Sequence, residues 1–493
     1  MPVKKASLSK WVPGTSFSPS TVSTPAWKPC PNSTKLTTHQ AAHFAHKSWC
    51  FFVYNCQVTN IDLNSKFREA LDIIENTSDH LFLTGNAGTG KSTLLNHFRN
   101  HTKKNIVVLA PTGVAAVNVA GETIHSFFHF KPNINLDEAK KIAKRLSDNK
   151  LFRSLDTIVI DEISMVRADL LDCVDVFLKT VSGSHLPFGG KQMIMIGDLY
   201  QLPPVVTSAE RDAISQMYSS PYFFSADVFP YLIQSLTDKL RFIELETIYR
   251  QADPDFIDLL NGVRNNTVNE NHLTAINSRV LMEPVYPKDH IVLTTTNEEA
   301  ETINQSRLDS IQGEVTQYLS KIKGDFPYKG LPTGELLNLK LGARVMLLNN
   351  DPEKRWINGT IGTVKSLEED RVLLSLDNGE TVDVLPFSWT MYKSVFNEAT
   401  QSIDHSEVGS FIQLPLKLAW AITIHKSQGK TFDKVVIDLG RGAFAHGQTY
   451  VALSRATSLK SIRLVRPLEH RHILMDQRIV NFIATLKHDL GLT

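Results

Sequence analysis

The chain has 493 residues, a formal net charge of +1 at pH 7, and 42% hydrophobic and 21% charged residues. This length predicts about three domains, and the composition is that of a soluble globular protein. The near-neutral charge excludes a globally basic, histone-like binder, but it permits a local basic groove for nucleic acid. No apolar run approaches the roughly 18–20 residues of a membrane-spanning helix, so no membrane partner is expected.

Cysteine usage points to a reducing compartment. Only four cysteines occur, and Cys173 is the only one after residue 60. A disulfide framework is therefore not expected. The bacterial cytoplasm is the expected location, with the nucleus or the mitochondrion as alternatives for a eukaryotic protein.

Residues 1–60 differ from the rest, because they contain no Asp, Glu or Arg and are rich in Ser, Thr and Pro. This composition predicts a disordered leader. A mitochondrial transit peptide and a mis-set translation start are the alternatives. Five side chains in the leader could bind zinc, although their spacing matches no strong zinc pattern: His39, His43, His46, Cys50 and Cys56.

The first lobe is predicted over residues 61–238, where strand-like and helical segments alternate. This alternation predicts a parallel sheet with helices on both faces. The expected helices lie near 61–78, from 114 and between 163 and 181, with a small insertion at 127–152. The expected strands are 81–83, 106–110, 157–160 and 193–196.

The most informative stretch is residues 81–92, in which an apolar strand leads into a glycine-rich turn and then a helix. This order, with the pattern G-x-x-x-x-G-K-[ST], is typical of a loop that cradles nucleotide phosphates. Glycine permits backbone conformations that turn successive N–H groups towards a phosphate. Lys91 is expected to reach the β- and γ-phosphates, and Ser92 to bind Mg²⁺. The expected nucleotide-binding residues are Gly85, Asn86, Ala87, Gly88, Thr89, Gly90, Lys91, Ser92 and Thr93.

Asp161 and Glu162 follow a buried strand, at the sheet edge where open parallel sheets place their ligand chemistry. Hydrolysis needs one carboxylate near Mg²⁺ and another that can polarise the attacking water. Asp161 is therefore the expected metal ligand beside Ser92, and Glu162 the general base. Gln201, just after the next strand, can sense the γ-phosphate or the water. A solvated helix N-terminal pair and a polar loop residue are the alternative roles.

The α/β alternation restarts after about residue 239, which predicts a second lobe over 239–334 and 413–493. Between 335 and 412 the pattern changes to short β-rich pieces, which suits a small barrel. The predicted fold class is α/β, with two lobes and a β-barrel inserted in the second. Its expected strands are 240–245, 291–293 and 435–437, and its expected helices begin at 254, 420 and 450.

The second lobe has no phosphate loop, because Ile424 stands where the first glycine of such a loop should be. It is therefore expected to close on a nucleotide held by the first lobe. An arginine that meets the developing charge accelerates phosphoryl transfer by roughly 10³–10⁵. Arg250 and Arg455 are the candidates, each expected at the edge of a helix in this lobe, and a surface salt bridge is the alternative role for each.

A series of short motifs in a fixed order resembles the Pif-type (RecD-like) branch of superfamily-one DNA helicases over roughly residues 61–490. The motifs are GxxGxGKS at 85–92, APTGVAA at 110–116, TIHSF at 123–127, DEIS at 161–164, GDxxQLPP at 197–204, YRQ at 249–251, HKSQG at 425–429 and YVALSRA at 450–456. The resemblance implies a 5′-to-3′ ATP-driven DNA helicase with two RecA-like lobes and an SH3-like barrel. Genome maintenance is the expected process, through replication, repair or recombination.

The resemblance also implies the cofactors, partners and site residues. ATP and Mg²⁺ are the expected cofactors, and single-stranded and tailed or structured duplex DNA the expected partners of a monomer. The matching ATP positions are Lys91, Ser92, Asp161, Glu162, Gln201, Arg250, Gln428 and Arg455. The positions in motifs that contact the DNA strand are Thr112, Gly113, His125, Ser126, His425 and Lys426.

A strand lying across both lobes needs polar groups for its phosphates and flat groups for its bases, each stacked base being worth about 1–3 kcal/mol. Thr112, Ser126 and Lys426 suit the phosphates. His125, His425 and Phe127 suit stacking, with a place in the core as the alternative for Phe127.

One departure concerns the base of the nucleotide. The family usually has a glutamine before the first strand that contacts adenine, and residues 63–69 contain none. Weak adenine selectivity is therefore expected. Two other functions stay open: a DNA-stimulated ATPase that acts as a recombination subunit or loader, and a P-loop ATPase that acts on protein.

Overall fold

The computed structural model describes residues 64–492 except 132, 235–238, 284–285, 288, 327–330 and 398–401. The predicted leader and its possible zinc ligands lie outside these residues. Within the part of the chain that is described, no helix is both long enough and apolar enough to span a membrane.

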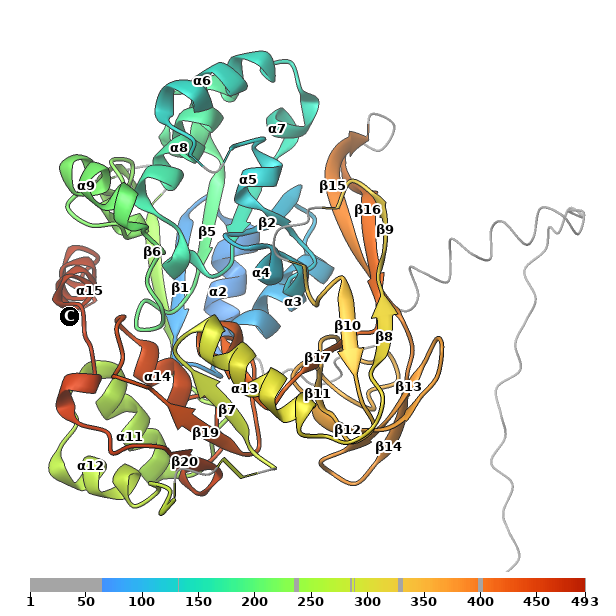
Figure 1. Cartoon of the computed structure of the whole chain (residues 1–493). Coiled ribbons are helices and arrows are strands. Elements are labelled where there is room, and N and C mark those ends of the chain that lie inside the picture. The colour runs from blue at the N-terminus through green and yellow to red at the C-terminus, as the bar shows by residue number, and fades with distance from the viewer. Residues whose placement is uncertain are drawn as a thin grey trace, which may run out of the picture. The chain divides into compact units, whose positions relative to one another are not determined.

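A six-stranded parallel sheet forms the first lobe, in the strand order β3-β2-β4-β5-β1-β6 (Figure 1). The interior strands are almost wholly buried, which explains why they read as continuous apolar runs. The strands are β1 His80–Gly85, β2 Ile106–Ala110, β3 Glu122–Thr123, β4 Thr157–Ile160, β5 Gln192–Ile196 and β6 Leu240–Leu245. The helices are α2 Ser65–Asn76, α3 Lys91–His101, α4 Gly113–Asn118, α5 Ile124–Phe127, α6 Leu136–Arg145, α7 Lys150–Ser154, α8 Ala168–Ser182, α9 Ser208–Met217 and α10 Phe229–Gln234.

Strand β6 belongs to the first lobe, so the expected start of the second lobe at residue 239 is wrong. β6 pairs in parallel with β1 from His80↔Leu240 to Gly85↔Leu245. A parallel strand has the same apolar pattern whichever sheet it joins, and the pattern alone therefore misplaced it. The chain enters the second lobe only after Leu245.

The insertion at 127–152 contributes to the core of the first lobe through its aromatic residues. Phe127 is 3% exposed and packs edge to face against Phe128 and Phe152. The base-stacking role expected for Phe127 is therefore wrong, and its core alternative holds. A short run of large aromatic residues fills a core more often than it forms an open stacking surface.

A four-stranded parallel sheet forms the second lobe, in the order β18-β7-β19-β20. The helix expected from Trp420 to His425 is wrong, because this segment contains a strand and a 3₁₀ turn at His425–Ser427. Its residues Ile422, Thr423 and Ile424 are β-branched and buried, which favours a strand. The strands are β7 Ile291–Thr294, β18 Ala421–Thr423, β19 Val435–Asp438 and β20 Ile462–Leu464, and the helices are α11 Pro254–Asn265, α12 Glu270–Asn277, α13 Asn297–Asp309 and α14 Gln448–Leu453.

The β-rich insertion extends beyond the expected 335–412. Its main sheet is antiparallel, in the order β14-β13-β12-β11-β17, with β11 Arg344–Leu347, β12 Ile361–Leu367, β13 Val372–Leu376, β14 Thr381–Val384 and β17 Leu416–Leu418. A second sheet contains β15 Phe387–Asn397, β16 Ser402–Gln413 and β9 Lys321–Gly324, and a ladder joins β8 Thr316–Leu319 to β10 Leu336–Leu339. The insertion begins and ends outside the expected bounds because β8, β9 and β17 pair within it.

The C-terminal helix, α15 Gln477–Asp489, packs on the first lobe, although residues 413–493 were expected in the second. Ile479, Ile483 and Leu486 share one core with residues of β1 and β6. The Phe482 ring stacks on Phe224 with centroids 4.0 Å apart. The chain therefore crosses between the lobes again after the second lobe is complete.

Candidate active site

The phosphate loop joins β1 to α3, and glycine is required where this loop meets other backbone. Gly88 and Gly90 have φ values of 84° and 87°, in the left-handed region. A Cβ added to Gly88 would lie 2.5 Å from the Cβ of Arg250. One added to Gly85 would lie 2.5 Å from the Leu245 carbonyl oxygen. The glycines thus let the loop turn tightly at the start of α3 without side chains of its own at these points, which is the shape of an anion cradle.

Lys91 lies over this loop, where its ammonium group donates to the carbonyl oxygens of Gly85 at 2.7 Å and Asn86 at 2.9 Å. Burial lowers the pKa of Lys91, and the carboxylates of Asp198 and Glu162 oppose that shift. The Lys91 ammonium group therefore lies between the carbonyl oxygens of the loop and the carboxylates of Asp198 and Glu162. This is the place of a cation that contacts phosphate.

Asp161 and Glu162 lie directly after β4, as expected, and both are partly buried. Burial raises the pKa of Asp161. Burial first, and the Asp161 charge second, raise the pKa of Glu162 to about 7. A carboxylate with a pKa near neutral pH is suited to accept a proton from water.

The Glu162 backbone is left-handed, with φ 52°, which is uncommon for a residue with a side chain. Conformations of this kind cluster at functional sites, where the surrounding structure holds them. The oxygens of Ser92 and Asp161 are hard ligands, which suit Mg²⁺. The donor set and the glycine cradle therefore fit a magnesium–nucleoside triphosphate.

Gln428 brings the second lobe into this site. Its side-chain amide donates to the Gln201 side-chain oxygen at 3.1 Å and to the Glu162 carboxylate at 3.4 Å. The Gln201 amide in turn donates to Asp198 at 3.2 Å. Hydrogen bonds thus link Glu162, the expected base, to Gln428 of the second lobe. They continue from Gln428 through Gln201 to the buried Asp198 of the first lobe.

Arg250 lies on the irregular segment between β6 and α11, not at a helix edge of the second lobe as expected. Its neighbour Tyr249 donates a backbone hydrogen bond to Gly88 at 3.0 Å. The Arg250 guanidinium donates to the backbone oxygens of Ser454 at 3.2 Å and Gly429 at 3.5 Å. The segment that carries Arg250 is therefore bonded to the phosphate loop through the Tyr249 backbone, and the Arg250 guanidinium contacts the second lobe.

Arg455 is 1% exposed and is held by its own lobe. Its guanidinium donates to the backbone oxygens of Val451, Ser427 and Lys430 at 2.9–3.2 Å. Burial, with the nearby Arg250, lowers the pKa of Arg455 to about 9. In this arrangement Arg455 ties the 427–430 loop to the end of α14, whereas Arg250 bridges the lobes.

Five residues that sequence reasoning missed complete the contact between the lobes. Arg264 of α11 lies 3.4 Å from Asp198 and its guanidinium lies 4.0 Å from the centre of the Tyr200 ring. The Tyr450 hydroxyl accepts from the Ala87 N–H at 3.1 Å, and the Asn261 side-chain oxygen accepts from the Asn86 amide at 2.9 Å. Asp198 lies in the GDxxQLPP motif and was within reach of sequence reasoning. One feature of the sequence could have identified Arg264: it is a charged residue on the apolar, buried face of the amphipathic helix α11.

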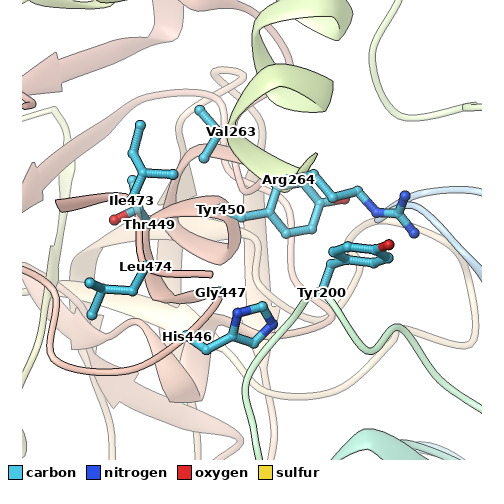
Figure 2. A pocket seen from close by; sticks show the side chains of 9 residues that line it. All are labelled: Tyr200, Val263, Arg264, His446, Gly447, Thr449, Tyr450, Ile473 and Leu474. Atoms are coloured by element: carbon cyan, nitrogen blue, oxygen red, sulfur yellow. The ribbon is translucent and has the colours of Figure 1, made fainter. Parts of the chain in front are cut away.

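A small pocket lies beside these contacts, between Tyr200 of the first lobe and α11 and α14 of the second (Figure 2). The Arg264 side chain extends beside the Tyr200 ring, and the Tyr450 ring and His446 lie on other sides of the pocket. The buried Arg264 Nε has no hydrogen-bond partner within the described part of the chain. The pocket is lined by Tyr200, Val263, Arg264, His446, Gly447, Thr449, Tyr450, Ile473 and Leu474.

The DNA-facing candidates of the first lobe lie at the starts of two short helices. Thr112 is exposed and caps α4 by accepting from the Ala115 N–H at 3.2 Å. Gly113 is the first residue of α4. Ser126 is exposed on α5, where burial lowers the pKa of the neighbouring His125.

The candidates of the second lobe lie on the turn after β18. Lys426 is exposed, and His425 is partly buried. The His425 ring stacks against Phe444 at an interplanar angle of 18°, with centroids 6.5 Å apart. Phe444 is 63% exposed, so it adds a flat aromatic surface that the sequence did not single out.

Two α/β lobes that meet at a phosphate loop, with a carboxylate of raised pKa and an arginine at their junction, define a two-lobed P-loop nucleotide hydrolase. The PIF1-like helicase family matches residues 60–274. The ATP-dependent DNA helicase Pif1 of Bdellovibrio bacteriovorus is 33% identical over 446 residues, which cover 86% of this chain and 92% of that protein. The ATP-dependent DNA helicase PIF1 of Homo sapiens is 34% identical over 427 residues, and the match covers 62% of its length.

A solved structure is similar over the same region. Bacteroides sp Pif1 in complex with ADP-AlF4 has a TM-score of 0.79 and 35% identity, covering 87% of this chain and 98% of that chain. The chain belongs to the PIF1-like helicases, a family of ATP-dependent DNA helicases. The two RecA-like lobes predicted from the sequence are confirmed, whereas the SH3-like character of the insertion stays a prediction.

Proposed function

We propose that the chain moves 5′-to-3′ along single-stranded DNA and unwinds tailed or structured duplex DNA for genome maintenance. The contact of Gln428 with both Glu162 and Gln201 carries this proposal, because it makes the geometry of hydrolysis depend on lobe closure. Solved structures of Bacteroides Pif1 with single-stranded DNA, at 35% identity, support the partner.

The chemistry assigned to the site is in-line hydrolysis of ATP. Lys91 and the loop N–H groups hold the phosphates, and Ser92 and Asp161 hold Mg²⁺, which neutralises charge on the phosphate oxygens. Glu162 accepts the proton of the attacking water, and Gln428 and Gln201 orient these two groups. Arg250 meets the negative charge that develops in the transition state.

The movement is assigned to alternating grip by the two lobes. Thr112 and Ser126 hold the DNA backbone from the first lobe, and His425 and Lys426 hold it from the second. Nucleotide binding and release shift the population between closed and open lobes, which changes the distance between the two grips. One chain supplies every group of this cycle, so a monomer is the proposed unit.

The direct experiment is strand displacement on duplexes with a 5′ or a 3′ single-stranded tail, measured beside ATP turnover with and without single-stranded DNA. Unwinding from the 5′ tail alone, with DNA-stimulated turnover, is the expected result. Stimulated turnover without displacement would support a loader or a recombination subunit instead. ATP turnover that is the same with and without single-stranded DNA would reject both the helicase and the loader or recombination subunit.

A further inference from the structure

Three lysines gather where the second lobe meets the β-rich insertion. Lys417 lies on β17, and Lys426 and Lys430 lie on the loop after β18. Lys417 pairs with Met346 of β11, and the next residue, Leu347, accepts from the Gly359 N–H, which lies beside the Lys430 stem. Lys417 is close enough to Lys426 and Lys430 for their charges to act on one another. Like charges repel at such distances, so this arrangement costs free energy unless an anion offsets it.

The described residues provide little negative charge to this cluster. None of the three lysines is among those that form an ion pair with a carboxylate in the described part of the chain. Glu301 is the acid that acts on Lys417 from a distance. Burial first, and Lys426 second, lower the pKa of Lys417 to about 8. Burial first, and Lys417 second, lower the pKa of Lys430 to about 8.

A neutral side chain holds Lys430 in place. Its ammonium group donates to the side-chain oxygen of Asn358, on the turn before β12. The Asn358 amide donates to Asn118, the last residue of α4, at 3.5 Å. A Cβ added to Gly359 would lie 3.6 Å from the Lys430 Cβ, so the turn packs along the lysine stem. Lys430 is therefore fixed at a junction of the insertion with both lobes, against an uncharged oxygen.

Several ammonium groups that share no carboxylate suit an anion with more than one oxygen, and a phosphate is the anion that this protein's partners carry. Lys426 is already a candidate for the DNA backbone, and Asn118 ends the helix that Thr112 begins. We propose that Lys417 and Lys430, together with Lys426, bind a backbone phosphate of single-stranded DNA, whose oxygen takes the place of Asn358 on Lys430. This inference rests on the proposed DNA-dependent function.

The salt dependence of DNA binding tests this site. The probe is an oligothymidylate with a fluorescent label, and its dissociation constant is measured against NaCl concentration with the full chain and no nucleotide. Removing one lysine that neutralises a phosphate of a single strand reduces the slope of log K against log salt by about 0.7. We expect this reduction, with several-fold weaker binding at low salt, for Lys430→Met and for Lys417→Met. Lys430→Arg should keep the slope.

Lys434→Met is the matched control. Lys434 is four residues further along the chain and forms a 2.7 Å ion pair with Asp289, so its loss removes the same charge outside the cluster. Its slope should equal that of the unaltered protein. A change as large as that of Lys430→Met would mean that net charge, not the cluster, sets the slope, and would overturn the assignment.

Changes at Asn358 separate a binding role from a structural one. Asn358→Asp places a carboxylate on Lys430, which competes with phosphate and should weaken DNA binding several-fold. Asn358→Ala removes the neutral acceptor and should leave DNA binding equal or tighter. If Lys430 served the fold alone, both variants would shift the melting temperature while DNA affinity stayed constant.

The outcomes distinguish this inference from the proposed function. Failure of the unaltered protein to bind the oligonucleotide would reject the function itself. Binding with an unchanged slope in Lys430→Met and Lys417→Met would overturn the lysine site and leave the function standing. An unchanged slope with a raised KM for ATP in the absence of DNA would assign the cluster to a nucleotide phosphate instead.

Discussion

The Tyr450 hydroxyl of the second lobe accepts a 3.1 Å hydrogen bond from the backbone N–H of Ala87 in the phosphate loop. Tyr450 is 4% exposed, and burial raises the pKa of its hydroxyl to about 12, so the group stays neutral. A neutral hydroxyl of one lobe therefore occupies an N–H group of the other lobe's anion cradle. Nucleotide phosphate and Tyr450 are set to compete for the same donor.

Tyr450→Phe should tighten ATP binding by up to about tenfold, because it leaves the Ala87 N–H buried without its partner until a phosphate accepts from it. Without ATP the same variant should melt at a lower temperature. Isothermal titration with a non-hydrolysable analogue and thermal unfolding measure the two effects. Tyr286→Phe is the control: it loses a 2.7 Å bond to Asp438 away from the loop, so its ATP affinity should not change. Weaker ATP binding in Tyr450→Phe would show that the hydroxyl contacts the nucleotide.

Glu162→Gln should keep ATP binding and stop hydrolysis, since a carboxamide cannot accept the proton of the water. The Gln428 amide can still donate to the new side-chain oxygen, so lobe contact is preserved. Lys91→Ala should instead lose nucleotide affinity or turnover, because the cation over the loop is removed. Single-turnover hydrolysis beside equilibrium binding of the analogue separates these effects. Near-normal turnover in Glu162→Gln would reject Glu162 as the base.

Arg250 and Arg455 should respond differently to substitution. Arg250→Ala should reduce kcat by roughly 10³ or more with little change in ATP affinity, because its charge acts in the transition state. Arg455→Ala should also lower the melting temperature by several degrees, since the buried guanidinium donates to three backbone oxygens. Steady-state kinetics and thermal unfolding of both variants supply the measurement. An Arg250→Ala effect confined to KM would make that arginine a ground-state clamp.

The sequence predicted the parts of the site that lie in short local patterns. The phosphate loop and the Asp161-Glu162 pair each follow one strand, so their structure depends on neighbours in the chain. Arg264 and Tyr450 lie far along the chain from the residues they contact, and no local pattern indicates which side chain reaches across the lobes. The same limit misplaced β6 and α15, because the apolar face of an element does not say which core it joins.

The base of the nucleotide should be weakly discriminated. Asn64 lies just before helix α2, and its side-chain amide donates to the Tyr249 hydroxyl at 3.3 Å. This amide is therefore already bonded within the protein and does not face the edge of a base. A Cβ added to Gly90 would lie 3.0 Å from the Phe67 ring and 3.8 Å from the Tyr249 ring, so two aromatic rings lie beside the end of the loop. Aromatic faces stack on any base and read no hydrogen-bonding edge. We expect kcat/KM for GTP and CTP within about tenfold of ATP, and a strong ATP preference would show that other contacts read adenine.

The last prediction concerns the coupling of DNA to hydrolysis through the second lobe. His425 and Lys426 lie on the 3₁₀ turn that leads directly to Gln428, which contacts Glu162. A DNA strand bound to this turn is therefore expected to hold the glutamine against the base. His425→Ala and Lys426→Ala should each reduce the DNA stimulation of ATP turnover several-fold and change the DNA-independent turnover less.

The measurement is turnover with and without single-stranded DNA, beside DNA affinity with and without a non-hydrolysable ATP analogue. Lys460→Ala provides a control, because Lys460 belongs to the same lobe but lies on the turn before β20, away from the Gln428 loop. Since closure brings both grips onto one strand, the analogue should change DNA affinity in the unaltered protein and change it less in the two variants. Equal DNA stimulation of ATP turnover in the unaltered protein, the two variants and the control would show that this turn does not couple DNA binding to hydrolysis, even if the chain unwinds DNA.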